Sequence, residues 1–64
     1  MPVYVLLLFD RDGAVIGADT LSVGDLAAAN AMAAEQLDAN TVATRFELWA
    51  DGELAGAGGH DTPP

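Results

Sequence analysis

The sequence predicts an α+β domain of ββαββ topology, in which a small antiparallel sheet has one helix packed on one face. Two apolar segments are each followed by turn residues typical of a β-hairpin, at positions 10–13 and 51–52. An alanine-rich stretch with helical spacing separates these two hairpins. We expect a single domain over residues 1–57, followed by a loose tail over residues 58–64 that has nothing to bury.

The first hairpin is predicted from a strand at Val3–Phe9, which contains only β-branched, aromatic and aliphatic residues. The strand ends at Asp10-Arg11-Asp12-Gly13. An aspartate at such a turn bonds its own backbone, and a glycine adopts the positive φ that closes a bulged hairpin. The chain then returns as a second strand over Ala14–Thr20.

A single helix is predicted for the middle of the chain. Ser22 is a suitable N-cap, and Asp25 three residues later forms a loose capping box and suits the helix dipole. The following residues are strong helix formers as far as Asn40, an acceptable C-cap. The residues at helical spacing that form the expected buried stripe are Leu26, Ala29, Ala33 and Leu37.

The second hairpin begins with a strand at Thr44–Ala50, which places Phe46 and Leu48 on one side and Trp49 on the other. Asp51-Gly52 is a strong two-residue hairpin signal and connects to a short strand at Glu53–Ala57. The pattern leaves open whether the two hairpins lie side by side in the sheet or interleave.

One helix covers one face of this sheet, but the first strand is apolar on both sides. Alternate residues point to opposite faces, Val3, Val5, Leu7 and Phe9 to one and Tyr4, Leu6 and Leu8 to the other. With Phe46 and Leu48 expected under the helix, we predict a second apolar face that acts as an interaction surface and consists of Tyr4, Leu6, Leu8, Trp49 and Leu54. A homodimer stacked sheet on sheet is the first interpretation and a different partner protein the second. A third alternative is that the hairpins curl enough to bury both faces internally.

The charge is strongly acidic, with ten Asp and Glu residues against two arginines and a net charge of −8. Such a chain repels phosphate backbones and anionic membranes, so we expect neither direct nucleic-acid binding nor membrane binding. The acidity is explained either by solubility alone or by a surface that imitates nucleic acid and occupies a basic protein. An acidic inhibitor or antitoxin-like protein is therefore the alternative function.

Catalytic, cofactor and metal sites are not expected, and we predict a protein that is not an enzyme. Cysteine is absent, and His60 is the one histidine. Asp10 and Asp12 precede a glycine as in a calcium loop, but the further oxygen ligands of that loop are missing. Ser22 has no histidine in an ordered segment to activate it. An accessory subunit of an enzyme stays possible on sequence grounds.

Met1–Phe9 is apolar, but it has no basic leader and is too short to span a bilayer. We therefore expect a cytoplasmic protein.

The positions of Tyr4, Phe9, Arg11-Asp12-Gly13, Glu47-Leu48-Trp49 and Asp51-Gly52 resemble a class of short uncharacterised bacterial proteins. Those proteins pair an N-terminal D-x-D-G hairpin with a C-terminal E-L-W-x-G hairpin. The resemblance covers nearly the whole chain and implies no activity. Residues 4–37 also resemble HicB-type antitoxins, which begin with a D-x-D-G hairpin and a later helix that contains alanine. This chain lacks the Pro-Asp-Leu-Pro-Gly-Cys segment that lies between them in those antitoxins.

Overall fold

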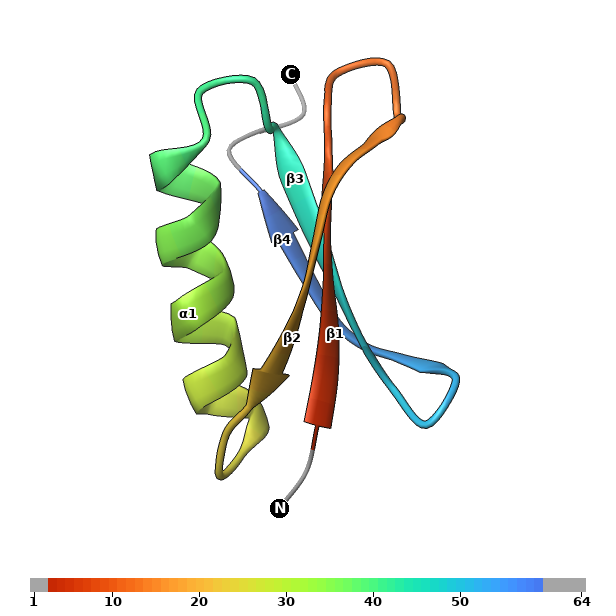
Figure 1. The fold of residues 1–64 in the computed structure, drawn as a ribbon, viewed down its shortest axis with the longest axis vertical. Helices are drawn as coiled ribbons and strands as arrows, with labels where there is room; N and C mark the ends of the chain where they lie inside the picture. Colours follow the sequence, from red (N-terminus) through yellow and green to blue (C-terminus); the bar gives the residue numbers. More distant parts are fainter. Residues whose placement is uncertain (1–2, 60–64) are drawn as a thin grey trace.

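The computed structural model describes residues 3–59 and has the predicted ββαββ topology. A four-stranded antiparallel sheet has the order β2-β1-β3-β4, and one helix packs against it (Figure 1). The elements are β1 (Val3–Phe9), β2 (Val15–Ser22), α1 (Leu26–Ala39), β3 (Arg45–Ala50) and β4 (Glu53–Gly59). The two hairpins therefore lie side by side and are joined by antiparallel pairing of β1 with β3.

The first turn forms as its residues predict. One side-chain oxygen of Asp10 accepts hydrogen bonds from the backbone N–H groups of Asp12, at 2.9 Å, and Ala14, at 3.0 Å. Gly13 has a φ of 85°, a left-handed conformation that glycine adopts without steric strain.

The second turn has positive φ at both central residues, 53° at Asp51 and 78° at Gly52. This combination is typical of a type I′ turn, whose twist matches that of the two flanking strands.

The helix begins later than predicted, because Ser22 belongs to β2, where it lies opposite Val3. Asp25 is the N-cap instead, and its side chain accepts a hydrogen bond of 2.8 Å from the N–H of Ala28. Asn40 caps the C-terminus as expected, with its backbone N–H directed at the carbonyls of Gln36 and Leu37. Because β2 pairs with β1 as far as Ser22, the N-cap of α1 lies three residues later in the chain than predicted.

The last strand is longer than predicted. Gly58 and Gly59, which were expected to start a loose tail, complete β4 opposite Phe46 and Arg45. The strand needs a glycine at position 58, because a Cβ atom there would lie only 2.9 Å from the ring of Phe46. The rest of the expected tail, residues 60–64, includes His60 and lies outside the described residues.

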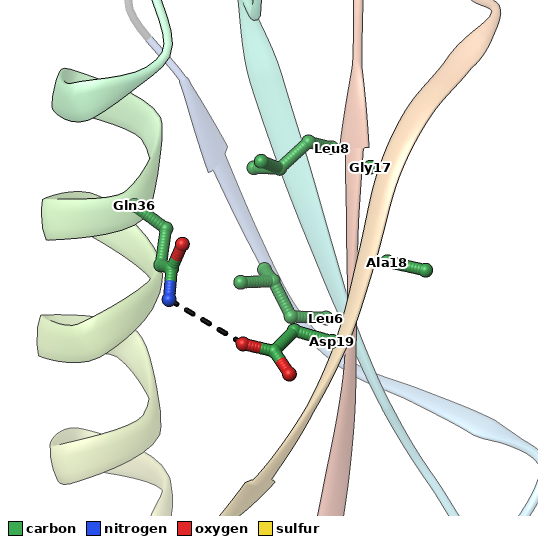
Figure 2. A pocket seen from close by; sticks show the side chains of 6 residues that line it. All are labelled: Leu6, Leu8, Gly17, Ala18, Asp19 and Gln36. Carbon is green, nitrogen blue, oxygen red and sulfur yellow. Dashed lines mark hydrogen bonds between the residues drawn. The ribbon is translucent and has the colours of Figure 1, made fainter.

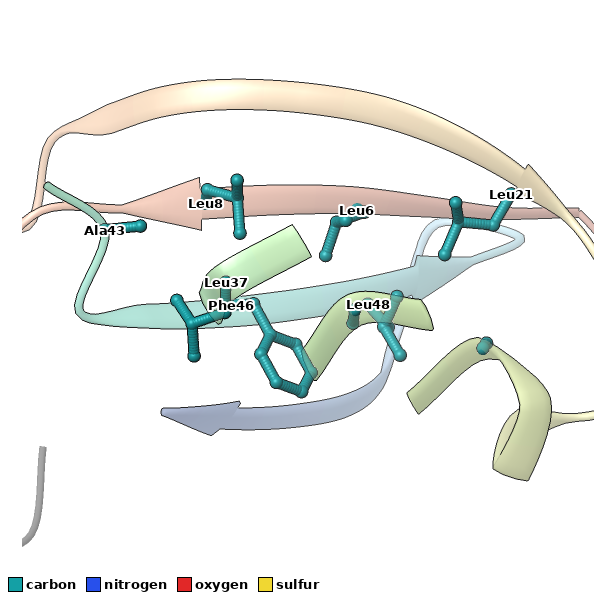
Figure 3. Close-up of a cluster of buried hydrophobic side chains, with 9 residues drawn as sticks. Leu6, Leu8, Leu21, Leu37, Ala43, Phe46 and Leu48 are labelled. Atoms are coloured by element: carbon teal, nitrogen blue, oxygen red, sulfur yellow. The ribbon is translucent and has the colours of Figure 1, made fainter. Parts of the chain in front are cut away.

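The hydrophobic core lies between α1 and one face of the sheet (Figure 3). Three residues of the predicted helical stripe, Ala29, Ala33 and Leu37, are buried, and Leu26 packs against them half-buried. The two alanines are fully buried and let the helix lie close to the strands. The buried residues that the sheet and the loop before β3 contribute are Leu6, Leu8, Leu21, Ala43, Phe46 and Leu48.

Candidate interaction surface

The pairing register decides which strand residues lie under the helix. Leu6 lies opposite Leu48 and Leu8 opposite Phe46, and residues opposite each other share a face of the sheet. Their neighbours in β1 and β3 therefore point away from α1. We call this uncovered side the open face; its residues are Val3, Val5, Leu7, Phe9, Val15, Ala18, Thr20, Ser22, Arg45, Glu47, Trp49, Leu54, Ala57 and Gly59.

This register corrects part of the predicted interaction surface. Leu6 is 1% exposed and Leu8 is 7% exposed in the core beneath α1, and Tyr4 packs against that core half-buried. The prediction was wrong for these residues because β1 is apolar on both sides. Hydrophobicity therefore did not show which set of alternate residues shares a face with Phe46 and Leu48. The expectation that Phe46 and Leu48 lie under the helix is confirmed.

Trp49 and Leu54 do lie on the open face, opposite each other across the second hairpin. Trp49 also lies opposite Val5 of β1. On β1, the open face presents Val3, Val5 and Leu7 instead of Leu6 and Leu8. Val3 is 50% exposed and Val5 is 42% exposed. Together with Leu54, 53% exposed, they form an apolar surface around a half-buried tryptophan.

An ordered polar network crosses the centre of the open face. Arg45 donates a hydrogen bond of 3.0 Å to one carboxylate oxygen of Glu47, and the indole N–H of Trp49 donates one of 3.1 Å to the other. The Arg45 guanidinium also lies 4.0 Å from the ring centroid of Phe9, at cation–π distance, and covers that ring. The Arg45 and Trp49 hydrogen bonds lower the pKa of Glu47 below its ordinary value of 4.5. Trp49 and Arg45 are consequently held in fixed orientations.

The open face is close to electrically neutral, although the protein is strongly acidic. Its two charged side chains, Arg45 and Glu47, form an ion pair with each other. The other acidic residues between positions 3 and 59 lie at the turns, on the helix or on strand positions that face the helix side: Asp10, Asp12, Asp19, Asp25, Glu35, Asp38, Asp51 and Glu53. The surplus negative charge is therefore carried elsewhere than on the open face.

The opposite side of the molecule has a small cleft of about 150 Å³ between α1 and β2. Figure 2 shows Leu6 and Leu8 at its floor and a hydrogen bond of 3.4 Å from Gln36 to Asp19 across it. The cleft is lined mainly by core residues and by small residues of β2. It lies on the helix side, and of its lining residues only Ala18 also belongs to the open face.

The described residues contain no group of three or more histidine, cysteine, aspartate or glutamate side chains placed to hold a metal ion. Within the same part of the chain, α1 is too short to cross a bilayer, and no helix qualifies as a membrane span. No protein-family model, curated protein or solved structure matches this sequence.

Proposed function

We propose that this protein is a small non-catalytic interaction module that associates with a second copy of itself by stacking the two open faces. The observation that carries the proposal is the exposure of Val3, Val5 and Leu54 around Trp49 on one side of the sheet. An antiparallel sheet with a solvated face normally shows polar residues there. A contiguous apolar surface with an oriented tryptophan and arginine has the composition of an interface centre.

Charge supports a second copy as the partner. A basic partner would favour acidic residues on the contact surface, but the open face carries only the Arg45–Glu47 pair. Two such faces meet without repulsion across the interface, and the remaining acids of each copy stay outside it. The net charge of −8 on each copy still acts at longer range, so added salt should strengthen the association.

The size of the face limits the strength of this dimer. Strands of about seven residues and four strands at about 4.8 Å spacing give a flat area on the order of 400 Å². Side-chain relief raises that figure, so two stacked faces come near the lower bound of about 1,200 Å² for specific interfaces. We therefore expect a reversible dimer that dissociates on dilution through the micromolar range.

Trp49 provides a direct test, because it is the single tryptophan of the chain and lies on the open face. On dilution, its emission should shift to longer wavelength and acrylamide should quench it more strongly, as the interface opens to water. Val5→Thr, which keeps a β-branched side chain, should weaken the dimer roughly tenfold, since each of the two copies loses about 0.5–1 kcal/mol of apolar burial. Val42→Thr is the matched control, because Val42 is 61% exposed in the loop after α1, away from the face.

Trp49 emission that does not change across the dilution series, in a protein of monomer mass, would contradict face stacking. An equal effect of Val5→Thr and Val42→Thr would also contradict it.

A second candidate function is the binding of a basic partner protein through the acidic residues that lie outside the open face. Asp19, Asp25 and Glu35 lie on the helix side or on α1, so they stay exposed when the open faces are stacked. This distribution favours a dimer that presents negative charge to a basic partner protein. Replacing Asp19 and Glu35 by Asn and Gln should abolish binding to that partner and leave the dimer intact. Binding that survives this change would rule the acidic surface out.

A further inference from the structure

The outer edge of β4 is unpaired in the described part of the chain, and a single bulge at Ala55 interrupts the strand. β4 is the last strand of the sheet, and no strand in the described part of the chain pairs with its outer side. Natural edge strands are usually shielded by charged residues, prolines, bulges or a covering element, and of these β4 has the bulge. After Leu54, β4 contains only alanine and glycine, so neither a charge nor a proline protects its outer backbone N–H and C=O groups.

We propose that this edge pairs with β4 of a second copy, antiparallel about a two-fold axis, to form a continuous eight-stranded sheet. The other edge is less suited to this. Two β2 strands paired in the same way would bring the central Asp19 of each copy close together, and like charges on paired strands are destabilising. β4 carries its one charge, Glu53, at its end, and antiparallel pairing moves the two Glu53 residues apart.

The position of the helix agrees with this pairing. α1 packs mainly on β3 and β4 and less on β1, so we place its axis roughly over the strip between β3 and β4. Strands lie about 4.8 Å apart, so a two-fold axis half a spacing beyond β4 is about 5 Å from the helix axis. The two copies of α1 would then run antiparallel about 10 Å apart. Packed helices have axes about 8–10 Å apart, so the two helices would touch when the strands pair.

The helix surface that would meet the second copy has small side chains. Asn30 marks the flank toward β4, because its side-chain oxygen lies 3.2 Å from the position of a Cβ atom at Gly56. Gln36 reaches Asp19 of β2 and marks the opposite flank. Ala27 and Ala34 are three residues before and four residues after Asn30, on the same flank, and both are exposed. Exposed alanines here leave room for a second helix at this distance.

The edge pairing is independent of face stacking, but it joins two open faces into one surface of twice the area. A protein that uses both interfaces would form a tetramer, four times the 6.5 kDa mass of one chain. The two interfaces have separate readouts. Trp49 emission reports the open face, and hydrogen exchange at the β4 amides that point away from β3 reports the edge.

Ala34→Glu tests the edge, with Ala28→Glu as its matched control. Both replace an exposed alanine of α1 with a bulky acid, but Ala28 is not on the flank with Asn30. By light scattering at high concentration, wild type and Ala28→Glu should have the same mass and Ala34→Glu half of it. The outward amides of β4 should exchange at least tenfold faster in Ala34→Glu. Circular dichroism should show all three proteins folded.

Equal masses and equal β4 exchange in the two variants would overturn the edge pairing. So would a wild-type mass that never exceeds twice the chain mass while Trp49 emission responds to dilution, since face stacking alone would then explain the association. A wild-type dimer that becomes a monomer in Ala34→Glu, with Trp49 emission unchanged on dilution, would instead support the edge pairing and contradict face stacking.

Discussion

Leu6 of β1 lies directly opposite Leu48 of β3, and both side chains are fully buried beneath α1. This pair joins the two hairpins at the centre of the sheet. It also determines that Val5 and Trp49, the adjacent pair, share the open face. A shift of one residue in the β1–β3 register would exchange the two faces of β1 and bring Val5 and Leu7 under the helix.

Replacing Asp25 by alanine should lower the stability of the protein, whereas replacing Ser22 should not, because Asp25 is the N-cap of α1. Asp25→Ala removes the hydrogen bond to the Ala28 N–H and should lower the free energy of unfolding by about 0.5–2 kcal/mol. Ser22→Ala changes an exposed strand residue and should stay within about 0.5 kcal/mol of wild type. Thermal unfolding of the two variants measures the difference. A larger loss in Ser22→Ala would mean that the helix begins earlier than Asp25.

Gly58 should not tolerate a side chain. Gly58→Ala places a Cβ atom 2.9 Å from two ring atoms of Phe46, whose ring is packed in the core, and should cost about 1–3 kcal/mol. Gly24→Ala is the control, since nothing lies within 4 Å of a Cβ atom there. Denaturant unfolding compares the two. Combining Gly58→Ala with Phe46→Leu should cost less than the sum of the separate changes, and full additivity would refute the proposed clash.

The close approach of α1 to the sheet depends on Ala33, which is 0% exposed. Ala33→Leu should force the helix away from β3 and β4 and lower stability by about 1–3 kcal/mol. Ala31→Leu makes the same change at an exposed helix position and should be close to neutral. Comparable losses in both variants would show that helix propensity, not packing against the sheet, limits stability.

The Glu47 network predicts a pH dependence. The Arg45 and Trp49 hydrogen bonds lower the pKa of Glu47 in the folded protein, whereas in the unfolded chain it returns toward its ordinary value of 4.5. The stabilisation of the folded protein by ionised Glu47 is therefore complete above about pH 4.5. It is lost as the pH falls through the lower pKa that Glu47 has in the folded state. Glu47→Gln should be less stable than wild type at pH 7, and this difference should shrink as the solution is acidified. Thermal unfolding at several pH values tests it, and a constant difference would contradict it.

Local chemistry in the sequence was enough to predict both hairpins and the helix. Asp10, Gly13, Asp51 and Gly52 specify turns through short-range hydrogen bonds and positive φ, effects that do not depend on the rest of the fold. The same holds for the helical spacing of Ala29, Ala33 and Leu37, all of which are buried. Strand alternation, a similarly local effect, placed Trp49 on the side opposite Phe46 and Leu48.

Only the tertiary structure decided which side of β1 meets the helix. Leu6 and Leu7 are the same residue type at adjacent positions, so no local preference separates them. The choice comes from long-range pairing with Leu48, and it replaced Leu6 and Leu8 by Val3, Val5 and Leu7 on the open face. Pairing also extended β2 through Ser22 and β4 through Gly59, because backbone hydrogen bonds to a neighbouring strand outweigh weak local propensities.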